Sequence, residues 1–369
     1  MRRPLTIMLL PLSLVGCGPA AKQEGATTPT PIATAPAPAV AAPLELALRS
    51  IPLPGAPPDG VYMDYLAYDA AHHRVWVPAG NTGSVDVIDA SNDQVTRIEG
   101  FPTIEMERKG KKRVVGPSSA TVGEGVVYVG NRGDNTICAV DASTLKKGAC
   151  VKLEQMPDGL QYVASSKEVW VTTPRDKSIH IIDVAHPNDL KLKEKLSFDG
   201  EPEGFAVDDA RGVFYTNLED KDRTLAIDVK TRKTTSTWLP ACGEDGPKGL
   251  ALDHALDFLI VACADHVIAL DAGHDGKLLG RIDTGDGIDG IDYVESRHEL
   301  FAGAARAAKL TVAKLDDKGN LTAIATIATH EGARNAVGTE TGAAYLTDSP
   351  EGKILVAAPA TATGTVLPN

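Results

Sequence analysis

A unit of about 43 residues recurs seven times between Tyr62 and Ala358, and repeats of this length are typical of propellers and solenoids. In five copies a β-branched run ends on an acidic residue. These acids are Asp89, Asp141, Asp183, Asp228 and Asp271. Successive acids lie 52, 42, 45 and 43 residues apart, so only the first interval holds a sizeable insertion.

Each unit contains four short runs that are typical of strands. An inner run follows a Pro or Gly turn, as in residues 202–208, and a second run follows it, as in residues 212–215. A third run ends on the acidic turn, and an outer run such as residues 193–198 comes after it. These β-branched and aromatic runs are separated by Gly, Asn, Asp and Pro, which is a hairpin pattern. The pattern predicts an all-β, seven-bladed β-propeller of four-stranded antiparallel blades.

Two tetrapeptides carry a family resemblance. Phe214-Tyr215-Thr216-Asn217 and Tyr345-Leu346-Thr347-Asp348, with the recurrent Pro-x-Gly-Leu-Ala start, resemble the YVTN-type seven-bladed propeller family. The resemblance covers roughly residues 60–358 and implies the fold. Similar propellers bind ligands, serve redox partners, adhere to surfaces or hydrolyse lactones, so function has to be argued from the site.

The ring has to close, and two segments are candidates for the outer strand of the seventh blade. Residues 44–51, Leu-Glu-Leu-Ala-Leu-Arg-Ser-Ile, are followed by a Pro- and Gly-rich turn that suits an outer-to-inner connection. We expect this N-terminal strand to complete blade seven. The competing closure uses residues 364–367.

The first 43 residues have a different composition from the repeats. Arg2 and Arg3 precede an apolar run, which is the pattern of a secretory signal, and the run ends in Leu14-Val15-Gly16-Cys17. That ending resembles the bacterial lipobox, which implies a signal peptide over residues 1–16 and a lipidated Cys17. Residues 17–43, rich in Ala, Pro and Thr, form an expected tether, and residues 44–369 form the propeller. The alternative is an ordinary cleaved signal.

These features predict a protein of the bacterial cell envelope that contacts the membrane through Cys17. Residue 18 is Gly and not the inner-membrane retention residue Asp, which favours the outer membrane, at its periplasmic or surface face. The formal charge of −12 becomes −14 without residues 1–16. An acidic body of this kind argues against nucleic acid as a partner.

Apart from Cys17, the chain has four cysteines, an even number for an oxidising compartment. Cys138 and Cys150 lie on neighbouring strands around a turn near Thr144. Cys242 precedes blade five and Cys263 ends its second strand, on the same face. Of three possible pairings, we expect Cys138 with Cys150 and Cys242 with Cys263. No Cys-x-x-Cys is present, so a structural role is favoured over a metal or redox role.

Loops that enter the inner strands share one face of a propeller, the top, with loops that join second to third strands. Alignment of the seven copies places one residue of each inner strand at the channel mouth. We call them the rim residues: Asp64, Ser118, Asp158, Glu203, Lys248, Asp289 and Arg334. Four acids, two bases and a hydroxyl converge on one axis, which makes this ring the candidate ligand or cation site.

The chemistry of the rim is left open between three interpretations. Paired carboxylates suit a hard cation such as Ca²⁺, although no calcium-loop motif is present, and a solvated mouth also tolerates charge. The Glu203-Gly204 pair resembles the Glu-Gly-Pro start of the regucalcin and gluconolactonase family, but Phe205 replaces the proline. A lactonase-like site would use Glu203, Arg334 and His330 as acid, anion clamp and base.

The single insertion, residues 100–116, is read as an irregular loop on the top face. Five of its residues form a basic patch on an acidic protein: Arg108, Lys109, Lys111, Lys112 and Arg113. The patch is either a solvated loop or a docking site for an anionic partner or polysaccharide, with salt-dependent attraction.

Two function classes follow from the sequence. No nucleophile motif, dinucleotide fingerprint or phosphate loop is present, so no catalytic residue is assigned and no cofactor is expected. We therefore favour a lipid-anchored binding or scaffold propeller whose top face takes a protein, polysaccharide or small molecule. The alternative is a periplasmic hydrolase with its site at the channel mouth.

Overall fold

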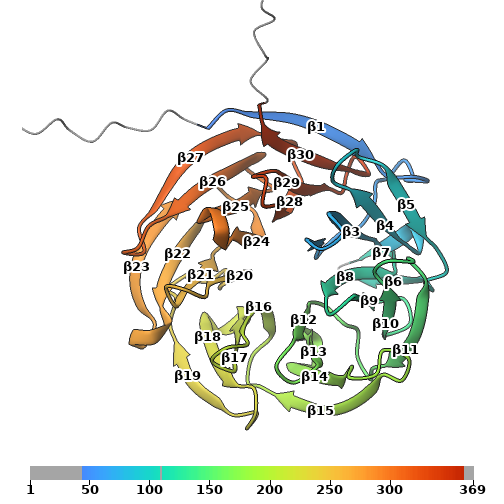
Figure 1. Cartoon of the computed structure of the whole chain (residues 1–369), viewed down its shortest axis with the longest axis horizontal. Helices are drawn as coiled ribbons and strands as arrows, with labels where there is room; N and C mark the ends of the chain where they lie inside the picture. The colour runs from blue at the N-terminus through green and yellow to red at the C-terminus, as the bar shows by residue number, and fades with distance from the viewer. Residues whose placement is uncertain (1–43, 109, 361–369) are drawn as a thin grey trace, which may run out of the picture. The chain divides into compact units, whose positions relative to one another are not determined.

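A computed structural model describes residues 44–108 and 110–360, and these form seven four-stranded antiparallel sheets arranged as blades around a channel (Figure 1). The first four blades are numbered in chain order from the inner strand outwards. Blade one is β2 (Ala67–Asp69), β3 (Arg74–Ala79), β4 (Ser84–Asp89) and β5 (Val95–Ile98). Blade two is β8 (Pro117–Val122), β9 (Val126–Asn131), β10 (Thr136–Asp141) and β11 (Lys147–Lys152). Blade three is β12 (Leu160–Val163), β13 (Glu168–Thr173), β14 (Ser178–Asp183) and β15 (Lys191–Ser197). Blade four is β16 (Pro202–Asp208), β17 (Val213–Leu218), β18 (Arg223–Asp228) and β19 (Thr234–Trp238).

The remaining three blades complete the ring, so the predicted seven-bladed propeller is confirmed. Blade five is β20 (Leu250–Asp253), β21 (Phe258–Ala262), β22 (His266–Asp271) and β23 (Lys277–Asp283). Blade six is β24 (Ile288–Val294), β25 (Glu299–Ala304), β26 (Lys309–Leu315) and β27 (Leu321–Ala328). Blade seven is β28 (Ala333–Gly338), β29 (Ala344–Asp348), β30 (Lys353–Pro359) and β1 (Leu46–Pro52). Short 3₁₀ turns are η1 (Gly80–Thr82), η2 (Pro174–Asp176), η3 (Glu219–Lys221), η4 (Ala272–His274) and η5 (Glu295–Arg297).

The core of the propeller lies between blades. The second and third strands of every blade are almost wholly buried, because both of their faces pack on neighbouring sheets. Trp170 of blade three stacks on Phe214 of blade four, with 4.5 Å between ring centroids. Burial of one large apolar side chain contributes about 1.5–3 kcal/mol, so stability comes from repeated contacts between neighbours.

The acidic turns that mark the repeat are hairpin residues. The Asp89 carboxylate accepts the Ser91 N–H at 2.9 Å, and Asp141 accepts the Thr144 N–H at 2.7 Å. Asp and Asn favour such turns because their side chains satisfy nearby backbone donors. The recurrence of these acids is therefore architectural.

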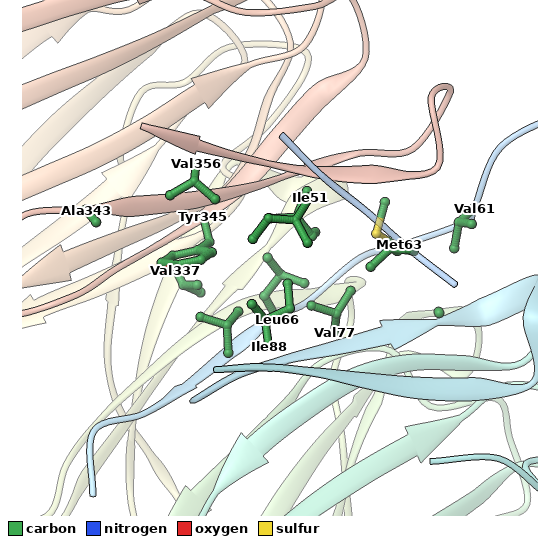
Figure 2. Packing of buried hydrophobic residues seen from close by; sticks show 14 residues of the cluster. Ile51, Val61, Met63, Leu66, Val77, Ile88, Val337, Ala343, Tyr345 and Val356 are labelled. Carbon is green, nitrogen blue, oxygen red and sulfur yellow. The ribbon is translucent and has the colours of Figure 1, made fainter. Parts of the chain in front are cut away.

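The N-terminal strand is the outer strand of blade seven. β1 pairs with β30 in antiparallel register from Leu46 opposite Pro359 to Pro52 opposite Lys353, and the two lie side by side in Figure 1. Ile51 is buried in a cluster with residues of blades seven and one (Figure 2). This is the closure that the sequence favours. The competing segment, residues 364–367, lies outside the described residues.

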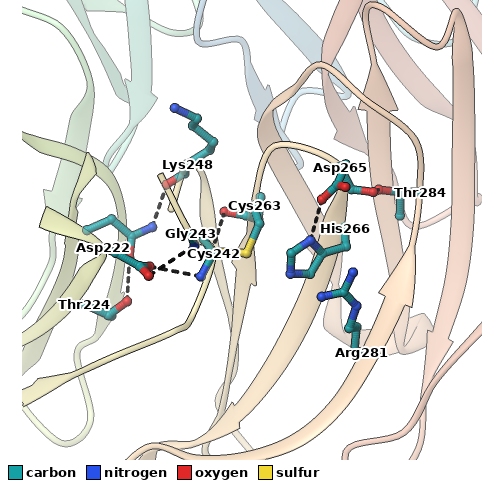
Figure 3. Close-up of a disulfide and its surroundings, with 12 residues drawn as sticks. Asp222, Thr224, Cys242, Gly243, Lys248, Cys263, Asp265, His266, Arg281 and Thr284 are labelled. Atoms are coloured by element: carbon teal, nitrogen blue, oxygen red, sulfur yellow. Dashed lines mark hydrogen bonds and ion pairs between the residues drawn. A yellow bond between two sulfur atoms is a disulfide. The ribbon is translucent and has the colours of Figure 1, made fainter. Parts of the chain in front are cut away.

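Both predicted disulfides are present. Cys138 lies opposite Cys150 in the β10–β11 register and is bonded to it, and Cys242 is bonded to Cys263. In Figure 3 the Asp222 carboxylate accepts the N–H of Cys242 at 3.0 Å and of Gly243 at 3.1 Å. The second disulfide therefore fixes the loop that leads to rim residue Lys248.

The insertion between blades one and two is not an irregular loop. It forms a hairpin of β6 (Ile104–Arg108) and β7 (Lys111–Val115). Gly110 has φ 74°, a conformation that favours glycine in a tight turn. The charged residues that suggested a loop in fact lie on the two strands of this ribbon.

The predicted signal peptide, lipidated Cys17 and tether, residues 1–43, lie outside the described residues, as does Lys109. No helix within residues 44–108 and 110–360 is long and apolar enough to span a bilayer.

Candidate ligand-binding cavity at the channel mouth

All seven rim residues line one cavity of about 650 Å³ at the top of the channel. They occupy the start of each inner strand or the loop just before it. The fold brings these side chains to one cavity, although the residues come from segments up to 270 positions apart. The cavity is predominantly polar, and residues of the second-to-third-strand turns complete its wall.

A small residue after the rim position lets the inner strands approach one another. Gly204 has φ +65°, and a Cβ there would come within 2.0 Å of the Lys248 carbonyl oxygen. A Cβ at Gly159 would come within 2.0 Å of the Phe205 ring. Only glycine fits these two positions, which explains the recurrent Pro-x-Gly start and keeps the rim narrow.

Arg132 neutralises two of the rim acids. Its guanidinium contacts Asp64 at 2.9 Å and also pairs with Asp158. All three side chains are only 17% exposed, so the pair is little screened by solvent. Asn335 also donates to the Asp64 carboxylate at 3.1 Å. Burial and the neighbouring acids raise the pKa of Asp158 to about 6, against the lowering effect of Arg132.

Two further ion pairs occupy the rim. Arg334 contacts Asp289 at 2.6 Å, and this carboxylate raises the pKa of the guanidinium. Lys248 pairs with Glu219 of η3. Outside the ring, Arg306 contacts Asp286 at 2.5 Å. Most of the cationic side chains in the cavity wall therefore already hold a carboxylate.

Glu203 differs from the other rim acids. Within the described part of the chain, no cationic group forms an ion pair with its carboxylate. Burial, followed by the charges of Asp158 and Asp289, raises the pKa of Glu203 well above its ordinary value. The cavity therefore holds a half-buried acid that forms no ion pair, although the charge of Lys248 acts on it.

Ser118 contributes a second unsatisfied group to the same cavity. The residue is 4% exposed, and its Oγ has no hydrogen-bond partner among the described residues. Buried hydroxyls usually form hydrogen bonds, so a buried hydroxyl without a protein partner is a candidate contact for a bound water or ligand.

The channel continues below the rim as a second cavity of about 400 Å³. The two cavities share no lining residue. Tyr65 of blade one and Phe205 of blade four line the lower cavity, with 5.5 Å between their ring centroids. Tyr65 lies one position after its rim residue and Phe205 two positions after its own, and the two rings lie between the polar mouth and the lower channel.

The hydrolase interpretation needs three residues that the fold does not bring together. Glu203 and Arg334 line the upper cavity, whereas His330 is not part of its wall. The Nδ1 atom of His330 instead contacts the buried Asp348 carboxylate at 2.7 Å. Within residues 44–108 and 110–360, no group of three or more His, Cys, Asp or Glu residues is arranged to hold a metal ion.

The residues of the predicted basic patch lie in different places on the hairpin: one lines the cavity and another is exposed to solvent. Arg113 lines the cavity and lies over the Tyr62 ring, 5.7 Å from its centroid. Lys112 is exposed and contacts Glu105 at 2.8 Å. Arg108 and Lys111 face each other in the register of β6 and β7. At least part of the patch therefore belongs to the mouth.

Sequence reasoning missed the second ring of charged residues. Arg132, Glu219 and Arg306 lie at or just after the ends of second strands, and all three line the cavity. A signal was present, because turns between second and third strands share the top face with the rim. Alignment of those turns would have placed Arg132 on the same face as Asp64 and Asp158, without showing that they pair.

No family model and no curated protein sequence matches the chain. Solved structures show the likeness in fold. A chain of a mitotic checkpoint complex superposes with a TM-score of 0.67 at 14% identity, over 92% of this chain and 98% of that one. A chain of the hydrazine synthase of Kuenenia stuttgartiensis gives 0.65 at 13% identity, over 81% and 95%. At these identities the likeness concerns the propeller fold alone.

Proposed function

We propose that this chain is a binding propeller of the YVTN type, anchored in the bacterial envelope, that takes a small-molecule ligand or part of a larger partner at its top face. The observation that carries the proposal is the single polar cavity lined by all seven rim residues. Propellers are rigid scaffolds on which function resides in the site. A concave, partly desolvated cavity with a few converging polar groups is the usual form of a ligand site.

The anchor is proposed from the sequence of the first 43 residues. A charged start, a short apolar run and Cys17 at the lipobox position favour lipidation. The Ala-, Pro- and Thr-rich stretch that follows would hold the propeller away from the bilayer. The two disulfides agree with an oxidising compartment. An outer-membrane position remains the favoured location.

Replacement of Cys17 by Ser is expected to release the protein from membranes, because the acceptor of the lipid is lost. Membrane fractionation and mass measurement of the mature N-terminus check this. The anchor would be refuted if the wild-type protein were soluble and its terminus carried no lipid. A matched control, Ser13→Ala, retains the cysteine and is expected to stay in the membrane fraction.

A bulky side chain at Ala305 is expected to fill the mouth and exclude ligands. Ala305 lines the cavity and belongs to no ion pair, so Ala305→Trp leaves the charged network intact. The neighbouring Ala307 is exposed and does not line the cavity, which makes Ala307→Trp the matched control. The measurement is ligand-observed NMR with a library of charged and zwitterionic small molecules.

We expect compounds that bind the wild type and Ala307→Trp to bind Ala305→Trp at least about tenfold more weakly, since steric exclusion removes most of their contacts. Equal binding to both variants would place the site elsewhere and refute the proposal. Failure of every compound to bind the wild type at millimolar concentration would also count against it.

A further inference from the structure

Some of the acids that line the upper cavity form ion pairs, and others do not. Asp64 and Asp158 share Arg132, Asp289 holds Arg334, and Glu219 holds Lys248. Within the described part of the chain, three lining acids have no ion-pair partner, namely Glu201, Glu203 and Asp245. Asp245 is exposed, and Glu201 precedes the inner strand. Glu203 is thus the one rim acid without an ion-pair partner among the described residues.

Burial of a carboxylate without a counter-charge is costly, and side chains of this kind are usually paired or protonated. The unpaired hydroxyl of Ser118 lies in the wall of the same cavity. A bound molecule that carries hydrogen-bond donors would supply the partners that these two side chains lack. Hydroxyl and carboxylate oxygens are both acceptors, and an ammonium group has three donors and no acceptor.

We propose that the mouth binds a small molecule bearing an ammonium group, and that this group pairs with the Glu203 carboxylate. The inference rests on the proposed function, which makes the mouth a ligand site, and adds the chemical class of the ligand. An anion fits less well. Among the described lining residues, Arg132, Lys248, Arg306 and Arg334 already hold carboxylates. Arg113 lies over the Tyr62 ring, and Arg175 is exposed.

A hard metal ion is also a poorer match to this arrangement. Ca²⁺ takes six to eight oxygen ligands, and the residues described here include no suitable group of three acids, histidines or cysteines. An ammonium group needs one carboxylate and a few acceptors. The geometry therefore favours an organic cation over an inorganic one.

The charge state of Glu203 makes the binding of an ammonium group dependent on pH. The groups whose charges act on Glu203 are Asp158, Asp289, Asp64 and Lys248. The three acids and burial raise the pKa of Glu203, while Lys248 opposes them. The free protein therefore binds a proton at Glu203 more tightly than an ordinary glutamate does. Since an ammonium group pairs with the ionised form, affinity is expected to rise with pH until Glu203 is fully ionised.

The test uses calorimetric titration of the propeller with 1,6-diaminohexane, and with 1,6-hexanediol as an uncharged analogue of the same length. Glu203→Gln removes the charge and keeps the shape. Glu331→Gln is the matched control, because Glu331 is an exposed acid that precedes blade seven and does not line the cavity. Titration with CaCl₂ tests the inorganic alternative. Melting temperatures show whether each variant is folded, and removal of a buried charge is not expected to destabilise the protein.

At pH 8 and low salt we expect the diamine to bind the wild type, and the diol to bind at least about tenfold more weakly. Glu203→Gln should weaken diamine binding about tenfold to a hundredfold, the effect of one charged hydrogen-bonded pair. Glu331→Gln should change it less than about threefold. Equal binding of diol and diamine, an unaffected Glu203→Gln, an equal loss in Glu331→Gln, or Ca²⁺ binding that competes with the diamine would overturn the inference. The proposed function would still stand if other compounds bound the mouth and were excluded by Ala305→Trp.

Discussion

Removal of the N-terminal strand is expected to destabilise the propeller by at least about 3–6 kcal/mol. Ile51 and Leu53 are 5% and 4% exposed, and burial of each such side chain contributes about 1.5–3 kcal/mol. A chain that begins at Pro54 also loses the seven-residue ladder between β1 and β30. That ladder protects β30, which would become an unpaired edge prone to aggregation. Urea unfolding of this truncation measures the loss.

The matched control for this experiment is a chain that begins at Pro43, which lacks the predicted tether and keeps β1. Its unfolding free energy is expected to equal that of the full mature chain. A milder comparison uses Ile51→Ala, expected to cost about 2–5 kcal/mol, against Leu48→Ala on the same strand, where the side chain is 36% exposed. Identical midpoints for the two truncations would show that another segment closes the ring.

Replacement of Arg132 by Met is expected to cost about 3–5 kcal/mol at pH 8, the usual effect of leaving buried charges without their partner. Arg132 is the common partner of Asp64 and Asp158. Methionine keeps much of the length of the side chain and removes the charge, so the cost reports electrostatics more than packing. Thermal or urea unfolding provides the measurement.

The cost of this replacement should fall as the pH is lowered. The pKa of Asp158 is raised to about 6 in the folded protein, mainly by burial, and Arg132 opposes that rise. A carboxyl with a raised pKa in the folded state stabilises the protein when protonated, and that stability is lost as the pH rises from its unfolded value through its folded value. Without Arg132 the pKa rises further, so destabilisation is larger at pH 8 than at pH 5. A pH-independent cost would contradict the account.

A second variant separates charge from packing at this position. The combined change Arg132→Met, Asp64→Asn and Asp158→Asn removes all three charges and is expected to recover most of the lost stability. If the triple variant were as unstable as Arg132→Met alone, the contribution of Arg132 would lie in its packing and its bond to the Pro157 carbonyl oxygen.

The fold was predictable because the same strand-forming runs and turn residues recur in each of the seven units. Each blade buries the same strands in the same order, so seven imperfect copies give one strong signal. The register also follows from the spacing. Cys138 and Cys150 face each other because a short turn joins their strands. The rim residues line one cavity because each occupies the same place in its repeat, at or just before the start of the inner strand.

The charge pairing at the mouth was not predictable by the same route. Arg132 reaches acids of blades one and three from a turn of blade two, and such contacts depend on the distance between blades. That distance is set by packing and not by the repeat. The Tyr65–Phe205 contact joins blades one and four across the channel for the same reason. The hairpin at residues 104–115 was missed because charged residues occupy most of its strand positions, so the alternation of apolar and polar residues that predicts a strand is weak there.

The rigid ring explains how the unpaired Glu203 is tolerated. Contacts between blades hold the rim in place, and the bulk of the stabilisation lies in the apolar layers of Figure 2 and their counterparts. A few kcal/mol of electrostatic cost at the mouth is small beside these layers, although it is large relative to the net stability of a typical domain. Functional sites commonly retain such locally unfavourable groups.

The central claim is that the mouth lined by the seven rim residues is the ligand-binding site. Its most direct test is crystallography on crystals of the propeller soaked with the compound that binds most tightly in the NMR screen. We predict density for that compound in the upper cavity, within hydrogen-bonding distance of a rim side chain and above Tyr65 and Phe205. Density only in the lower cavity or on the outer blades, with the mouth holding nothing but solvent, would contradict the account.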